Sequence, residues 1–140
     1  MSLHLDESRD YDPRNNPHKR HRGFKRLWMA TGHSLQGFIF ALKEESAFRQ
    51  ELCLAALMLP WAFAFDFNVV ERIFLIASVV LVLILELINS GIEAAIDRIS
   101  FDEHSLSKRA KDYGSAAVLL ALLLCAGIWI SLFTSHLPLK

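Results

Sequence analysis

Three long apolar segments constrain this chain more than any other feature of its sequence. The third segment, Ala116–Phe133, holds 18 residues without a charge, and apolar side chains also dominate Ala47–Phe67 and Glu71–Ile96. About 20 consecutive apolar residues are enough for a helix to cross a bilayer. Pro60 is expected to kink the first segment, because proline interrupts the helical hydrogen-bond ladder. We therefore predict an all-α membrane protein whose three transmembrane helices cover residues 47–67, 71–96 and 112–133.

The composition favours one small membrane domain. The chain has 140 residues, of which 53% are hydrophobic, and the hydrophobic residues come in blocks. No apolar run follows the first residues, so no signal peptide is expected. Cys53 and Cys125 lie inside apolar runs without a CxxC pattern or a metal-binding spacing, which favours a packing role for both. The sequence contains no P-loop, no GxGxxG pattern and no internal repeat.

A basic tail and an amphipathic helix precede the apolar segments. Residues 1–22 are polar and basic, so we expect a disordered tail that interacts with anionic lipid. Residues 24–43 carry apolar side chains on one helical face and charged or polar side chains on the other. An ordinary core-facing helix would show the same pattern. Because everything that follows is membrane-like, we interpret this segment as a helix that lies in the membrane interface.

The distribution of lysine and arginine predicts how the chain is oriented. If the N-terminus is cytoplasmic, thirteen of the fifteen basic residues face the cytoplasm, and only Arg72 and Lys140 lie outside. Positive charge is enriched on the cytoplasmic side of membrane proteins. The N-terminus is therefore expected in the cytoplasm and the C-terminus on the outer side of the membrane. This orientation brings the polar ends of the first two transmembrane helices and the 97–112 loop to one cytoplasmic layer.

The stretch ELINSGIEAAID, at residues 86–97, ends the second apolar segment with an acidic face. On a helix of about 100° per residue, four polar side chains fall within an arc of roughly 80°: Glu86, Asn89, Glu93 and Asp97. Asn89 would also suit helix packing, and Asp97 would also suit a helix end at the water boundary. Glu86 is harder to explain in these ways, because it lies on the order of 20 Å from the outer end of its helix. Acids at that depth usually mark a functional site.

The acidic layer has the donor types of a magnesium site. Carboxylates without histidine or cysteine partners suit a hard cation such as Mg²⁺, which usually binds together with substrate phosphates. Nearby lysines and arginines would balance phosphate oxygens, and a carboxylate near the lipid boundary would accept a proton from a hydroxyl. These residue types fit phosphoryl transfer to a lipid alcohol. They fit a proton or cation pathway equally well, whereas a scaffold without chemistry leaves Glu86 unexplained.

Three stretches make the chain resemble the bacterial diacylglycerol kinases, a family of small integral-membrane kinases. The stretches are EESAFRQE at 44–51, ELINSGIEAAIDRIS at 86–100 and SKRAKDYGSAAVLL at 107–120, in this order. The resemblance runs from about Gly23 to Phe133. It implies a homotrimeric bundle in which each chain has an interfacial helix and three transmembrane helices. It also implies a location in the bacterial inner membrane and active sites at the cytoplasmic surface that are shared between chains.

The reaction implied by this resemblance is transfer of phosphate from ATP to 1,2-diacylglycerol, giving phosphatidate, with Mg²⁺ as cofactor. Glu86 would be the general base for the lipid hydroxyl, and Glu45 and Glu93 would hold the metal. Asn89 and Asp97 would support the site. The implied ATP contacts are Arg26, His33, Glu45, Glu93, Asp102, Glu103, His104, Lys111 and Asp112. The implied lipid contacts are Arg26, Ala30, Thr31, Ser34, Leu35, Ile39, Ala47, Arg49, Gln50, Glu51, Glu86, Ser115 and Trp129.

Two other functions stay open at this point. An undecaprenol kinase would have the same fold and chemistry with a polyprenol acceptor, and the family contains both types. The RQE that follows AF, together with the long interfacial helix, favours diacylglycerol. A non-enzymatic proton or cation pathway along the Glu86–Asp97 face predicts ion flux without ATP dependence. No nucleic-acid partner is expected.

Overall fold

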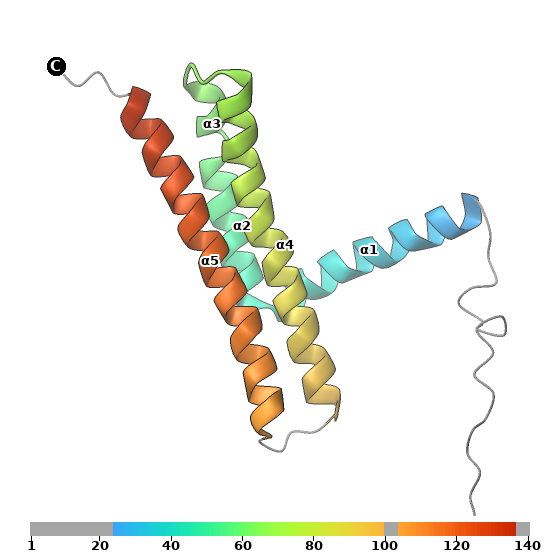
Figure 1. Cartoon of the computed structure of the whole chain (residues 1–140). Helices are drawn as coiled ribbons and strands as arrows, with labels where there is room; N and C mark the ends of the chain where they lie inside the picture. The colour runs from blue at the N-terminus through green and yellow to red at the C-terminus, as the bar shows by residue number, and fades with distance from the viewer. Residues whose placement is uncertain (1–23, 100–103, 137–140) are drawn as a thin grey trace, which may run out of the picture. The chain divides into compact units, whose positions relative to one another are not determined.

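The computed structural model describes residues 24–99 and 104–136, and the side chains from Trp28 onward. All regular structure in this part of the chain is helical, which confirms the predicted all-α class (Figure 1). The helices are α1 Phe24–Glu44, α2 Ser46–Met58, α3 Trp61–Ala64, α4 Val69–Ile99 and α5 Ser105–His136. The chain up to Phe38 and the chain from Ile39 onward form two compact units, which are described separately.

The first unit contains most of α1, in the region where an interfacial helix is predicted. Large apolar side chains on this helix are exposed, with Trp28 at 81% and Leu35 at 60%. Ser34 donates a hydrogen bond from Oγ to the carbonyl of Ala30 at 3.0 Å, so its hydroxyl is satisfied within the helix. A helix at a lipid surface exposes apolar side chains, and its polar groups form hydrogen bonds within the helix. The described part of α1 has both features.

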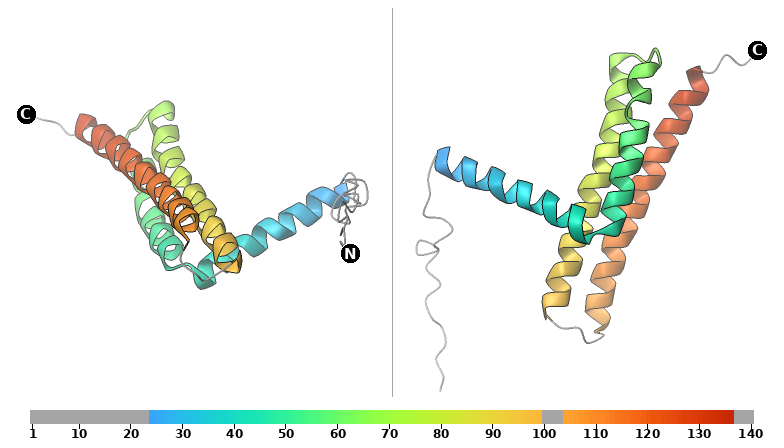
Figure 2. Two further views of the ribbon diagram at one scale, coloured as in Figure 1. Left: turned by 60° about the horizontal axis from the view of Figure 1, so that its bottom comes forward. Right: turned by 180° about the vertical axis from the view of Figure 1, so that it is seen from behind.

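The second unit is built on the long helices α4 and α5, which lie side by side in antiparallel directions (Figures 1 and 2). Contacts run in opposite sequence order along the pair, from Asp97 with Lys111, through Leu75 with Trp129, to Glu71 with His136. Shorter helices α2 and α3 pack on α4. The buried core is made by Ala55, Ala62, Phe67, Leu75, Val79, Val82, Ala121, Cys125 and Trp129.

Trp129 belongs to this core rather than to the outer surface of α5. Its side chain is 8% exposed, and its indole Nε1 donates to the carbonyl of Leu75 at 3.2 Å. A buried indole N–H needs a partner, and a carbonyl of the facing helix supplies it. A lipid contact at Trp129 is therefore not visible in the single chain and stays a prediction.

The first predicted span is divided at a proline. Leu59 and Pro60 both keep right-handed helical backbone angles, with φ of −55° and −56°. Proline lacks an N–H and cannot continue the ladder, so α2 ends at Met58 and α3 begins at Trp61. Together they run from Ser46 to Ala64, a rise of roughly 28 Å. Within the described residues, α4 and α5 are the helices long and apolar enough to cross a membrane, so the count of three spans stays a prediction.

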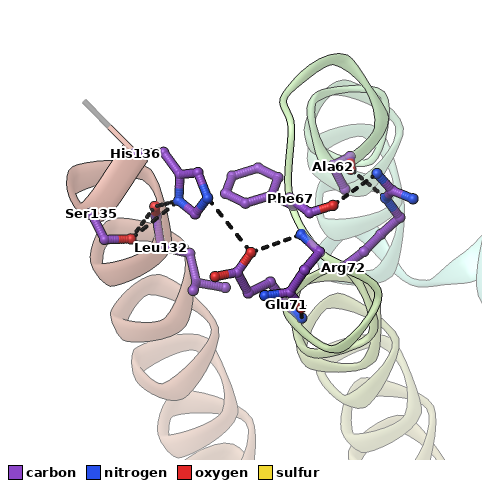
Figure 3. Close-up of polar contacts among 8 residues, drawn as sticks. Ala62, Phe67, Glu71, Arg72, Leu132, Ser135 and His136 are labelled. Atoms are coloured by element: carbon purple, nitrogen blue, oxygen red, sulfur yellow. Dashed lines mark hydrogen bonds and ion pairs between the residues drawn. The ribbon is translucent and has the colours of Figure 1, made fainter. Parts of the chain in front are cut away.

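Polar side chains tie together the end of the unit where α4 begins and α5 ends (Figure 3). Asn68 and Glu71 form a reciprocal capping box, with Asn68 N donating to Glu71 Oε2 at 2.8 Å and Glu71 N donating to Asn68 Oδ1 at 3.0 Å. Arg72 donates from Nε to the carbonyl of Ala62 at 3.0 Å and from a terminal nitrogen to that of Phe67 at 3.1 Å. We call Asn68, Glu71, Arg72 and His136 the corner cluster.

His136 brings α5 into the corner cluster. Its Nε2 lies 3.6 Å from Glu71 Oε2, and its ring packs edge-on against Phe67 with centroids 4.7 Å apart. Figure 3 shows the imidazole beside the Phe67 ring, with a dashed line to the Glu71 carboxylate. The corner cluster therefore fixes the loop between α3 and α4, and it holds the end of α5 against the start of α4.

Candidate functional site

The inward face of α4 continues from apolar residues into an acid and an amide. Its buried residues are Leu75, Ser78, Val79, Val82, Glu86 and Asn89. Their spacing of mostly three or four residues places them on one side of the helix. Glu86 is 4% exposed and Asn89 is 8% exposed, so both are as inaccessible as the core beside them. The structure thus buries the acid that the sequence singles out.

Three carboxylates gather at this level of the unit. Glu86 lies near enough to Glu93 and Glu45 for their charges to repel one another. Glu45 occupies the N-cap position of α2, but its side chain makes no capping hydrogen bond. Glu93 is half-buried and accepts a hydrogen bond at Oε1 from Asn89 Nδ2 at 3.1 Å. We call Glu45, Glu86, Asn89 and Glu93 the acidic cluster.

A further acid lies on the α2 side of the acidic cluster. Glu51 Oε2 is buried and has no hydrogen-bond partner among the described residues. Glu51 lies near enough to Glu86 for the two carboxylates to repel each other when both are charged. Glu51 also lines a cavity of about 30 Å³ that is otherwise walled by apolar side chains of α2, α4 and α5 and by Cys125. The interior near Glu86 therefore contains acceptor oxygens that the protein itself leaves unused.

Asp97, four residues after Glu93 on α4, pairs with a lysine of α5. Lys111 Nζ donates to Asp97 Oδ1 at 2.5 Å, and this hydrogen bond raises the pKa of Lys111 above its ordinary value. The pair joins the end of α4 to the beginning of α5, as the antiparallel arrangement requires. In the described part of the chain, Asp97 therefore forms an ion pair with Lys111, and its proposed support of the site stays a prediction.

Arg49 and its neighbours form a groove on the outer side of α2. Arg49 donates from a terminal nitrogen to the carbonyls of Leu42 and Lys43 at 3.3 and 3.2 Å, where α1 ends. The end of a helix leaves such carbonyls without partners, and Arg49 satisfies two of them. The groove has a volume of about 450 Å³ and is lined by Ser46, Arg49, Gln50, Cys53, Leu54 and Leu57. The lining is polar at Ser46, Arg49 and Gln50 and apolar at Leu54 and Leu57.

The remaining predicted contacts are distributed over exposed positions. Ile39, Ala47, His104, Asp112 and Ser115 are all exposed in the second unit. The exposed α1 residues Ala30, Thr31, His33, Ser34 and Leu35 belong to the first unit, whose place relative to the acidic cluster is not described. Asp102 and Glu103 lie outside the described residues, as does the side chain of Arg26.

Sequence reasoning missed Gly114, which faces Asn89 across the contact between α4 and α5. A Cβ built on Gly114 would collide with Asn89 Oδ1 and would lie 3.2 Å from Asn89 Cγ. The signal that was available is a glycine inside an apolar helix, which weakens the helix unless close packing requires it. Periodicity alone does not say which residue of another helix such a glycine faces.

The acidic cluster fits a Mg²⁺ ion that is bound together with a phosphate ligand. Glu45 and Glu93 supply carboxylate oxygens, and Asn89 Oδ1 is buried without a hydrogen-bond partner in the described part of the chain. Within residues 24–99 and 104–136, no group of three or more metal-binding side chains could hold an ion by itself. Mg²⁺ typically uses one or two carboxylates and takes its other ligands from substrate phosphates and water. The carboxylates of Glu45 and Glu93 match this usual coordination of Mg²⁺.

Comparisons with known proteins converge on one family. The sequence profile of prokaryotic diacylglycerol kinase matches residues 32–133. A diacylglycerol kinase from Pseudomonas aeruginosa is 46% identical over 117 residues, which cover 84% of this chain and 95% of the relative. One from Escherichia coli K12 is 46% identical over 114 residues, covering 81% and 93%. One from Haemophilus influenzae is 45% identical over 107 residues, covering 76% and 91%.

Proposed function

We propose that this chain, which belongs to the prokaryotic diacylglycerol kinase family, transfers phosphate from ATP to the hydroxyl of a membrane diacylglycerol. Membership rests on the profile match over residues 32–133 and on relatives that are 46% identical over most of the chain. The family and the two apolar helices together identify an integral-membrane lipid kinase. The single observation that carries the chemistry is the burial of Glu86 beside Glu45 and Glu93.

Glu86 is the general base of the proposed reaction. Its carboxylate accepts the proton of the diacylglycerol hydroxyl, and the hydroxyl oxygen forms a bond to the γ-phosphorus of ATP. The bond from that phosphorus to the β–γ bridging oxygen breaks, so ADP leaves with the electron pair and phosphatidate is formed. The burial of Glu86 keeps water away from the hydroxyl that must react.

Glu45 and Glu93 are the proposed magnesium ligands. A bound Mg²⁺ would neutralise negative charge on the ATP phosphates and hold them in place. Asn89 keeps the Glu93 carboxylate in position through its hydrogen bond. Lys111, fixed by Asp97, supplies positive charge that phosphate oxygens attract.

The proposed assembly is a homotrimer with shared sites in the bacterial inner membrane, with the N-terminus in the cytoplasm and the C-terminus in the periplasm. The excess of lysine and arginine in the segments that flank the acidic cluster supports this orientation. Glu45 and Glu93 are only half-buried in the single chain. Further chains would enclose these carboxylates, which a membrane environment favours. Three transmembrane helices in each chain belong to the same proposal.

Competition between lipid acceptors tests this function. The full chain in mixed micelles receives labelled ATP together with dioleoylglycerol and undecaprenol, with Mg²⁺ or with a chelator. We expect Mg²⁺-dependent labelling of dioleoylglycerol. Labelling of undecaprenol alone would show that the acceptor is a polyprenol, with the same phosphotransfer chemistry. If neither lipid is labelled and proteoliposomes instead conduct protons or cations without ATP, the kinase proposal is wrong.

A further inference from the structure

Gly114 lies at a close contact between α4 and α5, directly against the acidic cluster. A Cβ at this position would overlap Asn89 Oδ1 and approach Asn89 Cα to 3.7 Å. The described glycines at 32, 37, 91 and 127 differ, because a Cβ on any of them would meet nothing within 4 Å. No left-handed backbone angle explains the glycine, since Gly114 lies within the continuous helix α5. A side chain at residue 114 would therefore have to displace the Asn89 amide.

The Asn89 carboxamide fills the space beside Gly114. Asn89 is 8% exposed, and its amide group lies against the backbone of α5 at Gly114. From there Nδ2 donates to Glu93 Oε1 at 3.1 Å, while Oδ1 has no hydrogen-bond partner among the described residues. A side chain at residue 114 would push the amide out of this position. The direction of the Glu93 carboxylate thus depends on a glycine of another helix.

We propose that Gly114 is a positioning residue of the phosphotransfer site, because its missing side chain lets Asn89 lie against α5 and hold the Glu93 carboxylate toward the metal and the ATP phosphates. The inference rests on the proposed function, in which Glu93 is a magnesium ligand. Residues that hydrogen-bond to metal ligands fix the orientation of those ligands, and their loss typically lowers metal affinity about 10- to 100-fold. Gly114 acts one step further away, through Asn89.

Simple helix packing is the competing explanation for Gly114. Small residues let membrane helices approach closely, and such a residue affects stability without directing a particular carboxylate. The two explanations differ in what happens to the Asn89 amide. Packing alone predicts a less stable Gly114→Ala protein with an unchanged Asn89–Glu93 hydrogen bond. Positioning predicts that this bond is lost even where the protein stays assembled.

Side-chain amide NMR of the full chain in micelles separates them. The sequence has four asparagines, at 15, 16, 68 and 89, so asparagine labelling with ¹⁵N gives few signals, and Asn89→Ser identifies the relevant one. Asn68, which bonds to Glu71 in the corner cluster, is the internal reference. In Gly114→Ala we expect the Asn89 signal to move and its hydrogen exchange to accelerate while Asn68 stays fixed. Gly127→Ala, on the same helix with open space around it, should change neither signal.

The magnesium requirement gives the second readout. Gly114→Ala should raise the Mg²⁺ concentration for half-maximal phosphotransfer about tenfold and leave the KM for diacylglycerol unchanged. An unmoved Asn89 signal, or an equal effect of Gly127→Ala, overturns the proposal. If the wild type phosphorylates no lipid, the proposed function fails, but the NMR result still decides whether Gly114 positions Asn89.

A double variant covers the case in which Gly114→Ala does not assemble. In an Asn89→Ala background the collision is absent, so Gly114→Ala has nothing left to displace. Equal Mg²⁺ half-saturation in Asn89→Ala and in Asn89→Ala/Gly114→Ala supports the proposal. A further tenfold rise in the double variant contradicts it, because Gly114 would then act without Asn89.

Discussion

The corner cluster and the acidic cluster place polar groups at two levels of the same helix, α4, and treat them in opposite ways. In the corner cluster each polar side chain has partners within the chain: Asn68 with Glu71, Arg72 with two carbonyls, and Glu71 with His136 (Figure 3). In the acidic cluster and beside it, like charges face one another, and Asn89 Oδ1 and Glu51 Oε2 lack hydrogen-bond partners among the described residues.

This difference separates polar groups that stabilise the fold from polar groups that are kept for a ligand. A buried acceptor without a partner destabilises a protein by about 1–3 kcal/mol, so it persists where something else uses it. Repulsion among neighbouring carboxylates also destabilises the folded protein, and a bound cation or proton relieves it. Substitutions in the acidic cluster should therefore impair activity while sparing stability, and substitutions in the corner cluster should do the reverse.

The largest expected effect belongs to Glu86→Gln. Loss of a general base typically lowers the rate by about 10²- to 10⁴-fold, and glutamine keeps the shape of the side chain. The free energy of unfolding should stay equal or rise, because a repelled buried charge is removed. Initial rates of phosphate transfer to dioleoylglycerol measure the first effect, and denaturant titration in micelles measures the second. Full activity of the variant would exclude Glu86 as the base.

Glu93→Gln should act mainly through the metal. We expect the Mg²⁺ concentration for half-maximal rate to rise at least about tenfold, the range seen when metal ligation is perturbed. Magnesium titration of the initial rate is the measurement. Glu44→Gln is the matched control, because Glu44 is an exposed acid next to Glu45 at the end of α1. A similar Mg²⁺ shift in both variants would show that general negative charge matters, and not the position of Glu93.

Arg72→Gln should change stability and leave catalysis alone. The Arg72 guanidinium donates to the carbonyls of Ala62 and Phe67 and lies 5.5 Å from the ring centre of Phe63. Hydrogen bonds from charged groups contribute about 1.5–3 kcal/mol, so we expect a decrease of that order in the free energy of unfolding. Equilibrium unfolding in mixed micelles measures it. A loss of phosphotransfer in fully folded Arg72→Gln protein would show that the corner cluster also affects catalysis.

Glu71→Gln should have the smallest effect, and it should act on stability. Glutamine can keep the capping box with Asn68, so the substitution removes only the charge that faces His136. Ion pairs near a protein surface contribute less than about 1 kcal/mol, so the free energy of unfolding should fall by less than that amount. Equilibrium unfolding in micelles measures the decrease, with the same substitution in a His136→Gln background as the control. An equal decrease in both backgrounds would show that the contact between Glu71 and His136 does not stabilise the protein.

Periodicity and composition predict the features that lie within one helix. The helical class, the two long apolar helices and the inward burial of Glu86 with Asn89 all follow from a repeat of three or four residues. The break near Pro60 follows from the missing N–H of proline.

Contacts between two helices cannot be predicted from the three- or four-residue periodicity of one helix. The contact of Gly114 with Asn89 and the reach of Arg72 to the carbonyl of Ala62 depend on how one helix is placed against another. The pairing of Asp97 with Lys111 is of the same kind, because it depends on how α5 is placed against the end of α4. The burial of Trp129 against Leu75 likewise depends on the facing helix.

The measurement that tests this account most directly compares Glu86→Gln and Arg72→Gln in one set of micelles, for both phosphate transfer to dioleoylglycerol and unfolding free energy. The account predicts opposite outcomes: Glu86→Gln is inactive and at least as stable as the wild type, and Arg72→Gln is active and less stable. If Glu86→Gln stays active, or if both variants lose activity and stability together, the acidic cluster is not a catalytic site set apart from the fold.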